Sequence, residues 1–300
     1  MPLWRFIALV FLAVAVIVVL AIWVFPATAD FRPDNPFWNG LEDFRTKHKV
    51  TTLVSLAELP PDAQESVLVL IPYREPRTAD VDQLKSFLKG GGTVVLADDY
   101  GFGNPILEAL GAEFRFNRSP LLDPLFNYRD KWFPLATEIS PSSLTAGVTS
   151  LAFDYATVLE GPGLTVVARS SPFSFLDLNV NGKSDTDEPT GPFPVAGYSS
   201  VAGGRLILVS DPSIFISSMT GANDNARFIA NLLGAAGASP RALVDQSFLP
   251  PSTLTEAKGG LARVRVAAGR PTVLVVLTAA LGVVLLYPAW RRSGGSRDSE

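Results

Sequence analysis

The sequence contains no cysteine and only one histidine, His48, among its 300 residues. Without cysteine, the chain cannot form disulfide bonds, thiolate metal sites or cysteine nucleophiles. A single histidine excludes a zinc site built from several histidines, and a Ser-His-Asp triad would depend on His48 alone. The formal net charge of −4 gives no support to nucleic-acid binding. The common cysteine- and histidine-dependent enzymes are therefore not expected, and nucleic acid is not an expected partner.

Long apolar runs stand near both ends of the chain. Residues 6–25 carry no charged or amide side chain, and this length is sufficient to cross a bilayer. Residues 272–287 form a second apolar run, which Trp290 and two arginines follow as interfacial anchors. The predicted plan is a membrane anchor at 1–29, an α/β domain at 30–236, a linker or stalk at 237–270, a transmembrane helix at 271–290 and a tail at 291–300. Ala27-Thr28-Ala29 also has the form of a signal-peptidase site, so cleavage after Ala29 stays open.

The distribution of positive charge predicts the orientation in the membrane. Arg5 precedes the first apolar run, and three arginines, at 291, 292 and 297, follow the second. Other arginines between the two runs favour the opposite orientation. A long loop is translocated largely regardless of its charge, so the short tails carry more weight. We expect a cell-membrane protein with both termini in the cytoplasm and the main domain outside it.

The stretch of residues 67–111 organises the predicted fold. Residues 67–71 and 93–97 are near-uniformly apolar segments of strand length, and residues 80–88 between them have apolar side chains at helical spacing. Two buried strands joined by an amphipathic helix indicate parallel pairing with a right-handed crossover. We therefore predict an α/β fold with a mostly parallel sheet flanked by helices.

The second half of the chain predicts additional strands and one more helix. The strands are expected at 148–159, 164–168, 193–198 and 205–209, and the helix at 223–233. Asp211 is expected to cap a helix start that has Pro212 at its first position. Residues 237–270 are rich in Pro, Ser, Thr, Gly and Ala, which is typical of a linker.

Candidate ligand-binding residues are Tyr73, Arg74, Asp98 and Asp99. They follow the first two strands of the organising stretch, and ligands of open α/β sheets favour the crevice beyond the carboxyl ends of the strands. Paired carboxylates can perform general acid and base catalysis. Alternatively, Asp98 or Asp99 accepts hydrogen bonds from the glycine loop that follows. Residues 114–136 mix cationic and aromatic side chains, which indicates either a binding surface or a cover over the core.

The segment Asp177–Glu188 matches the twelve-residue calcium loop at every defined position. The expected ligands are Asp177, Asn179, Asn181, the carbonyl group of Lys183, Asp185 and Glu188. Ca²⁺ requires six to eight oxygen ligands, and Gly182 permits the sharp turn that lets these groups converge. Pro189 prevents the helix that leaves a true EF-hand, so the loop would be helix-free. The alternative is an acidic hairpin turn whose side chains face water.

Three stretches of the chain carry a resemblance to a known family. They are LKSFLKGGGTVVLADDYGFGNPILEALG with the preceding Pro60-Pro61 turn, the loop SFLDLNVNGKSDTDEPTGPFPVA, and GGRLILVSDPSIFISSMTGANDNARFIANLL. Together they resemble the membrane proteins of domain-of-unknown-function family 4350 over residues 37–234. The resemblance implies a fold similar to class I glutamine amidotransferases and an association with MoxR-type ATPases. It implies no amidotransferase activity, because that activity requires a Cys-His-Glu triad and the chain has no cysteine.

These observations predict a membrane-anchored, non-catalytic binding or assembly module with a structural calcium ion and protein partners in the membrane. One alternative is a surface hydrolase that uses Asp98 and Asp99 on a glycan or another polymer. A second alternative is a cytoplasm-facing partner of a MoxR-type ATPase system.

Overall fold

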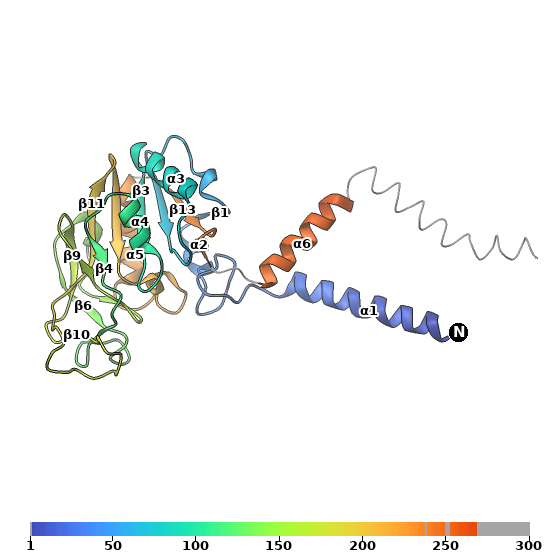
Figure 1. The fold of residues 1–300 in the computed structure, drawn as a ribbon, viewed down its shortest axis with the longest axis horizontal. Coiled ribbons are helices and arrows are strands. Elements are labelled where there is room, and N and C mark those ends of the chain that lie inside the picture. The colour runs from blue at the N-terminus through green and yellow to red at the C-terminus, as the bar shows by residue number, and fades with distance from the viewer. Residues whose placement is uncertain (1, 238, 250–252, 269–300) are drawn as a thin grey trace, which may run out of the picture. The chain divides into compact units, whose positions relative to one another are not determined.

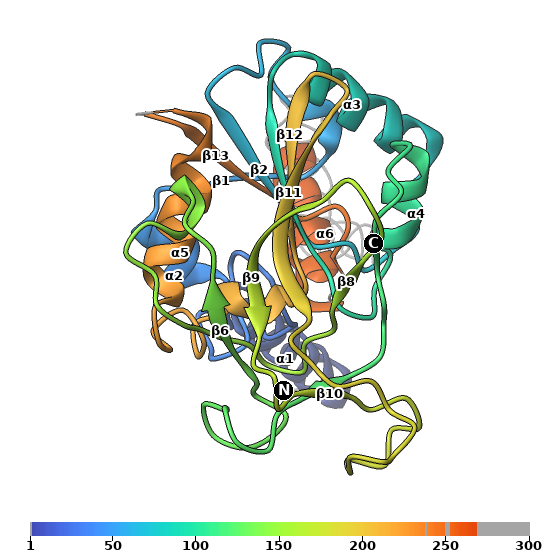
Figure 2. The ribbon, with the colours of Figure 1, turned by 90° about the vertical axis from the view of Figure 1, so that its left-hand side faces the viewer.

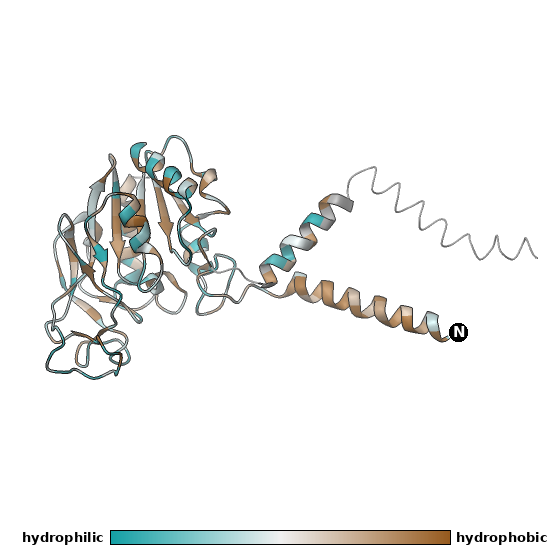
Figure 3. Cartoon of the chain, in the orientation of Figure 1, coloured by the Kyte–Doolittle hydropathy of each residue, from teal (hydrophilic) through white to brown (hydrophobic). Residues whose placement is uncertain are grey.

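The computed structural model describes residues 2–237, 239–249 and 253–268. The chain divides into two compact units, one of Met1–Phe25 with Pro251–Glu300 and the other of Pro26–Pro250. In the first unit, helix α1 (Leu3–Val24) is apolar along most of its length (Figure 3), and its segment Phe6–Val24 is long and apolar enough to span a membrane or to act as a signal sequence. The expected second membrane helix at 271–290 and the tail at 291–300 lie outside the described residues.

In the described part of Pro26–Pro250, nine strands form one sheet in the order β1-β13-β2-β3-β12-β11-β9-β6-β7 (Figure 1). Their bounds in this order are Thr51–Leu53, Arg241–Asp245, Ser66–Leu70, Thr93–Ala97, Gly204–Val209, Pro194–Val201, Thr165–Ser170, Leu135–Ile139 and Leu151–Ala152. The first five strands are parallel to one another, and each later strand is antiparallel to its neighbour. The predicted α/β class with added strands from the second half is confirmed.

Helices cover both faces of the parallel part of the sheet. Helices α2 (Glu42–Lys47) and α5 (Asn225–Leu233) lie on one side, and α3 (Thr78–Lys89) and α4 (Gly103–Ala109) lie on the other (Figure 2). Side chains alternate along each strand, so the valines of β2 join the core under α5 and its leucines join the core under α3. Both sets are fully buried, which explains the uniformly apolar strand sequences.

Helix α3 forms because its apolar residues recur at helical spacing and its first turn is capped. Leu84, Phe87 and Leu88 are buried against the sheet. Asp80 accepts a hydrogen bond from the backbone N–H of Arg77 at 2.9 Å, which satisfies a donor before the first turn. The helix ends at a run of glycines, and a Cβ atom at Gly92 would lie 2.4 Å from the ring of Phe87. Glycine is required there because the chain turns back tightly over that ring.

Short elements complete the domain. Two additional two-stranded sheets pair β4 (Arg115–Phe116) with β8 (Leu159–Glu160) and β5 (Leu121–Leu122) with β10 (Phe175–Leu176). The 3-10 helices are η1 (Leu56–Glu58), η2 (Ser143–Thr145), η3 (Pro212–Phe215) and η4 (Gly234–Ala236). The single strand expected at 148–159 is replaced by β7 and β8, which belong to different sheets.

The segment 237–270 differs from the expected linker. It contains β13, which lies between β1 and β2 in the sheet, and helix α6 (Thr253–Ala268). Residues Ala242, Leu243 and Val244 of β13 are buried, and burial of a leucine or valine side chain contributes about 1.5–3 kcal/mol. Only three consecutive apolar residues mark this strand in the sequence, so its composition resembles that of a linker. The α/β domain therefore extends through β13, beyond residue 236.

Candidate functional site

The carboxyl ends of three parallel strands meet at one edge of the sheet. Leu70 of β2 pairs with Leu96 of β3, and Ala97 of β3 pairs with Val209 of β12. The loops that leave these strands consequently begin at the same level and carry Tyr73, Asp99 and Asp211 to that edge. This is the place where open α/β sheets bind their ligands.

A cleft of about 410 Å³ lies at this edge. Its aromatic lining residues are Phe31, Trp38, Tyr73, Phe133 and Tyr155. Its acidic lining residues are Asp30, Asp99 and Asp154. Of the four predicted site residues, Tyr73 and Asp99 line this cleft, whereas Arg74 and Asp98 do not. We call this space the carboxyl-edge cleft.

Asp98 is turned away from the cleft and supports the glycine loop. Its two carboxylate oxygens accept hydrogen bonds from the backbone N–H groups of Gly101 at 2.9 Å and Gly103 at 2.8 Å. Burial raises the pKa of Asp98 to about 7, although the hydrogen bond from Gly103 opposes the shift. A Cβ atom at Gly101 would lie 2.4 Å from Asp98 Oδ1 and from the carbonyl oxygen of Pro72. Glycine is needed there because the carboxylate and a neighbouring loop approach so closely.

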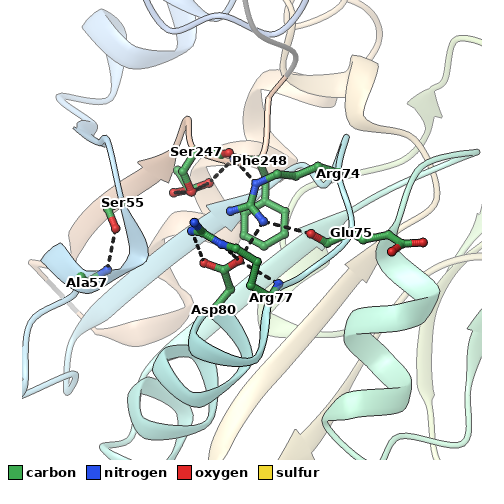
Figure 4. A network of polar contacts seen from close by, with 9 residues as sticks. Ser55, Ala57, Arg74, Glu75, Arg77, Asp80, Ser247 and Phe248 are labelled. Atoms are coloured by element: carbon green, nitrogen blue, oxygen red, sulfur yellow. Dashed lines mark hydrogen bonds and ion pairs between the residues drawn. The ribbon is translucent and has the colours of Figure 1, made fainter.

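Arg74 links the ends of β2 and β13 to the start of α3 (Figure 4). Its Nε donates to the carbonyl oxygen of Ser247 at 2.8 Å, and its Nη1 donates to Asp80 Oδ2 at 2.7 Å. The guanidinium carbon lies 3.9 Å from the centre of the Phe248 ring. Arg77 adds a second ion pair to Asp80 at 2.9 Å. Arg74 is thus engaged in holding the fold together.

Asp211 holds together two loops that border the cleft. It accepts hydrogen bonds from the backbone N–H groups of Asp154 at 2.7 Å and Ser213 at 2.6 Å. The second bond makes it the cap of helix η3, as the sequence predicts, with Pro212 at the first helical position. Complete burial raises the pKa of Asp211 well above its ordinary value. Through the first bond, Asp211 fixes the backbone of Asp154, which lines the cleft together with Asp99.

Burial disfavours the charge of two of the cleft carboxylates. Burial raises the pKa of Asp99. Burial also raises the pKa of Asp154, where attraction by Arg129 opposes the shift and repulsion by Asp99 adds to it. The pKa of the Tyr73 hydroxyl is raised by burial and then by Asp99 and Asp30. The cleft is consequently a region of negative potential.

The aromatic walls are held in place by neighbouring rings. Tyr155 stacks on Trp132 with ring centres 4.9 Å apart, and Tyr73 contacts Phe31 at 5.4 Å. Both Tyr155 and Phe31 have left-handed backbone conformations, with φ of 57° and 56°. Bulky residues rarely adopt this conformation, and such strained positions cluster at functional sites.

The sequence provided little indication of several cleft residues. Asp30, Trp38 and Asn39 lie in a segment whose composition indicates only an entry loop. Long-range hydrogen bonds bring this segment to the cleft, for example from the backbone N–H of Ser218 to the carbonyl oxygen of Trp38 at 3.0 Å. Asp154 reaches the cleft through Asp211, which is distant in sequence. The available signals were the Asn39-Gly40 turn and the acidic and aromatic pair at 154–155.

The predicted calcium loop is curled by hydrogen bonds from its own backbone. Asp177 accepts from the N–H groups of Asn181 at 3.0 Å and Gly182 at 2.7 Å. Glu188 accepts from Leu178 at 2.8 Å and from Asp185 at 3.1 Å. The side chains of Asp177 and Glu188 are therefore drawn towards the inside of the loop, and both residues are buried.

The remaining predicted ligands form a polar group on the exposed side of the loop. The amide groups of Asn179 and Asn181 each donate to Asp185 Oδ2 at 2.8 Å, and these bonds lower the pKa of Asp185. The backbone N–H of Lys183 donates to Asn181 Oδ1 at 2.7 Å. Among the residues that the structure describes, no group of three or more His, Cys, Asp or Glu side chains is arranged to hold a metal ion.

Comparisons with known proteins identify a family but no activity. The profile described as domain of unknown function (DUF4350) matches residues 33–233. A search of curated proteins finds no match. The mmIFT52 N-terminal domain is similar in structure, with a TM-score of 0.47, 13% identity, and coverage of 61% of this chain and 81% of that one.

Two glycosidases show weaker structural similarity. For the β-galactosidase from Bacillus circulans sp. alkalophilus, the TM-score is 0.38 at 14% identity, over 58% of this chain and 23% of that one. For the exo-β-1,4-mannosidase Op5Man5 from Opitutaceae bacterium strain TAV5, the TM-score is 0.33 at 14% identity, over 61% of this chain and 27% of that one. TM-scores below 0.5 support no functional assignment.

Proposed function

The chain belongs to the DUF4350 family, and we propose its function from the carboxyl-edge cleft because the family description names no activity. We propose that the protein is a membrane-anchored module that binds a ligand or a protein partner in this cleft. The observation that carries this proposal is the carboxyl-edge cleft itself. It combines a volume of about 410 Å³ with aromatic walls and carboxylates such as Asp99 and Asp154. Concave, largely apolar sites with a few converging polar groups are the usual form of a ligand site.

Binding is favoured over hydrolysis by the state of Asp98. A hydrolase that uses Asp98 and Asp99 as acid and base needs both carboxylates at the substrate. Asp98 is 3% exposed, and both of its oxygens accept backbone hydrogen bonds. Of this pair, only Asp99 lines the cleft. A single carboxylate of this pair supports recognition of a ligand better than catalysis.

We propose that the module lies outside the cytoplasm, with both chain ends inside. The arginines beside the two apolar runs and the apolar character of α1 support this orientation. The family resemblance adds an amidotransferase-like fold and protein partners in the membrane. A cytoplasm-facing partner of a MoxR-type ATPase is the alternative that a reversed orientation would favour. Protease protection in intact cells distinguishes the two, since digestion of the domain from outside is expected only for the first.

The loop Asp177–Glu188 is proposed to bind Ca²⁺ as a structural ion. The carboxylates of Asp177 and Glu188, the side chains of Asn179, Asn181 and Asp185 and the carbonyl group of Lys183 would hold it. The loop already has the turn at Gly182, whose φ is +71°, and inward hydrogen bonds to Asp177 and Glu188. The ion would replace the hydrogen bonds that Asp185 now accepts. Extracellular calcium is sufficient for a site with a Kd of about 10⁻⁴–10⁻³ M.

Photo-crosslinking in growing cells tests the binding function. A benzophenone amino acid replaces Trp38, which lines the cleft and is exposed, and in a control protein it replaces Gln64, which precedes β2 at the opposite edge of the sheet. An adduct is expected from position 38 alone, and Asp99→Asn combined with Asp154→Asn should remove it. Equal labelling at both positions, or no adduct at position 38, would contradict the proposal.

A further inference from the structure

The carboxyl-edge cleft has an excess of negative charge among its described lining residues. Asp30, Asp99 and Asp154 line it, and no lysine or arginine is among the described residues that do so. None of the ion pairs formed by the described residues includes any of these aspartates. Burial disfavours the charges of Asp99 and Asp154, and repulsion by Asp99 adds to the effect at Asp154, so a ligand that supplies positive charge would relieve an existing electrostatic cost.

Arg129 does not neutralise this charge within the cleft. Its attraction lowers the pKa of Asp154, but burial outweighs it. The guanidinium carbon of Arg129 stands 5.2 Å from the centre of the Tyr128 ring and 6.0 Å from that of Phe133. Arg129 is not one of the residues that line the cleft. The negative charge of the cleft is therefore not compensated by Arg129.

The lining of the cleft favours an organic cation over a metal ion. The cleft aspartates do not form a group of three or more acidic or histidine side chains arranged to hold a metal, by the geometry of the described residues. Five of the eleven residues that line the cleft are aromatic. Ring faces attract organic cations, which keep an apolar surface around the charge. A neutral sugar could stack on these rings and donate hydroxyl hydrogen bonds to the aspartates, but it would not neutralise their charge.

The walls are positioned before a ligand arrives. Tyr155 is held by Trp132, and Tyr73 is held by Phe31. Asn39 donates a side-chain hydrogen bond to Asp30 at the rim. The backbone of Asp154 is fixed by Asp211. Such preorganisation reduces the ordering cost of binding.

From this arrangement we infer that the carboxyl-edge cleft binds an organic ammonium group, with Asp99 and Asp154 facing its charge and Tyr73 and Tyr155 covering its apolar surface. The inference rests on the proposed binding function and specifies the ligand class. Two sources share this chemistry: a quaternary ammonium group, which favours the ring faces, and a primary amine on an alkyl chain, which favours the carboxylates.

Calorimetric titration of the full-length protein in detergent tests the inference with four probes. Choline and n-butylamine represent the two ammonium types, and 3,3-dimethylbutan-1-ol and n-butanol are their neutral counterparts. At least one ammonium probe is expected to bind tenfold or more tightly than its neutral counterpart. Tighter binding of choline assigns the quaternary type, and tighter binding of n-butylamine assigns the primary type.

The variant Asp154→Asn provides the matched test of charge. It keeps the side-chain shape, and the hydrogen bond to Asp211 comes from the backbone of residue 154, so the fold should be retained. A fivefold or greater loss of ammonium affinity is expected. The control Asp82→Asn removes the same charge from an exposed position of α3 and should leave the affinity unchanged.

Three results would overturn the inference: no ammonium binding, equal binding of a neutral counterpart, or an unchanged affinity in Asp154→Asn. The cellular crosslink at position 38 reports separately on the binding function. If that crosslink forms while the ammonium probes fail, the cleft is a binding site for another ligand class. If both experiments fail, the binding function itself is contradicted.

Discussion

Trp132 stacks face to face on Tyr155, with ring centres 4.9 Å apart and an angle of 17° between the rings. The backbone N–H of Tyr155 also donates to the carbonyl oxygen of Trp132 at 2.9 Å. Next to Trp132, Lys131 donates a side-chain hydrogen bond to the carbonyl oxygen of Gly182 in the predicted calcium loop. Trp132 therefore lies between that loop and the wall of the carboxyl-edge cleft.

We predict that Trp132→Ala weakens binding in the cleft. Tyr155 is 48% exposed and has a left-handed backbone, so without the stacked ring its side chain would lose its fixed position. Aromatic pairs contribute about 0.5–1.5 kcal/mol beyond their burial, which corresponds to an affinity loss of about 2- to 12-fold. Titration with the tighter ammonium probe measures this change.

The control for this substitution is Phe173→Ala. Phe173 also belongs to an exposed aromatic stack, since its ring centre lies 5.7 Å from that of Phe126. It does not line the cleft. Its removal should leave the affinity unchanged. An equal loss in both variants would show that general destabilisation, and not the position of Tyr155, is responsible.

A second prediction concerns the calcium loop. Ca²⁺ at millimolar concentration should raise the Tm of the full-length protein, and Mg²⁺ should not, because Mg²⁺ is smaller and requires stricter geometry. Glu188→Gln should abolish the shift by removing one of the two carboxylate oxygens that would bind Ca²⁺. Asp187→Asn makes the same charge change in the same loop at a position that the motif leaves undefined, and it should keep the shift. The alternative of a solvent-facing turn predicts no calcium response in any of the proteins.

The organising part of the fold could be predicted from the sequence because its signals are local. Strand β3 was expected at 93–97 and has these bounds, because its five residues are all buried and four of them are apolar. Helix α3 was expected from the spacing of Leu84, Phe87 and Leu88. In contrast, β13 enters the middle of the sheet from the end of the domain, and its short apolar run does not specify its neighbours.

The cleft could be predicted only in its location. The strand ends indicated the correct edge of the sheet and two of its residues, Tyr73 and Asp99. The sequence did not distinguish Asp99 from Asp98. Neighbouring side chains point to opposite faces of a strand, and the conformation of the loop after β3 decides which of the two aspartates reaches the cleft. Asp154 comes from a chain segment whose place depends on the tertiary contact with Asp211.

A third prediction separates the structural role of Arg74 from that of its neighbour Arg77. Arg74→Lys keeps the charge but cannot form both the stacked contact with Phe248 and the separate bonds to Ser247 and Asp80. A loss of about 1–3 kcal/mol in the free energy of unfolding is expected, as for charged hydrogen bonds of this kind. Arg77 also pairs with Asp80, but its side chain is 69% exposed, so Arg77→Lys should cost less than about 1 kcal/mol.

Urea unfolding of the full-length protein, followed by tryptophan fluorescence, measures both substitutions. The carboxyl-edge cleft should still bind the tighter ammonium probe in Arg74→Lys at urea concentrations where the variant is folded, because Arg74 does not line it. Equal stabilities of the two variants, or a selective loss of probe binding in Arg74→Lys, would contradict this assignment.

The fourth prediction follows from the pKa of Asp98, which burial raises from 3.8 to about 7 in the folded protein. Between these values the folded state holds a proton that the unfolded state has released. Stability must therefore fall as the pH rises from about 4 to about 7, and burial raises the pKa of Asp99, Asp154 and Asp211 in the same direction. The asparagine side chain in Asp98→Asn cannot ionise, so the Tm of this variant should depend less steeply on pH between about 4 and 7. The variant also loses one hydrogen-bond acceptor for Gly101 or Gly103, which lowers its Tm at every pH and leaves the expected difference in slope. Measurements of the Tm from pH 4 to 7 test this prediction, and Asp82→Asn, at an exposed position, is the control. If the Tm of Asp98→Asn changes with pH as steeply as that of the unmodified protein, Asp98 is already ionised throughout this range.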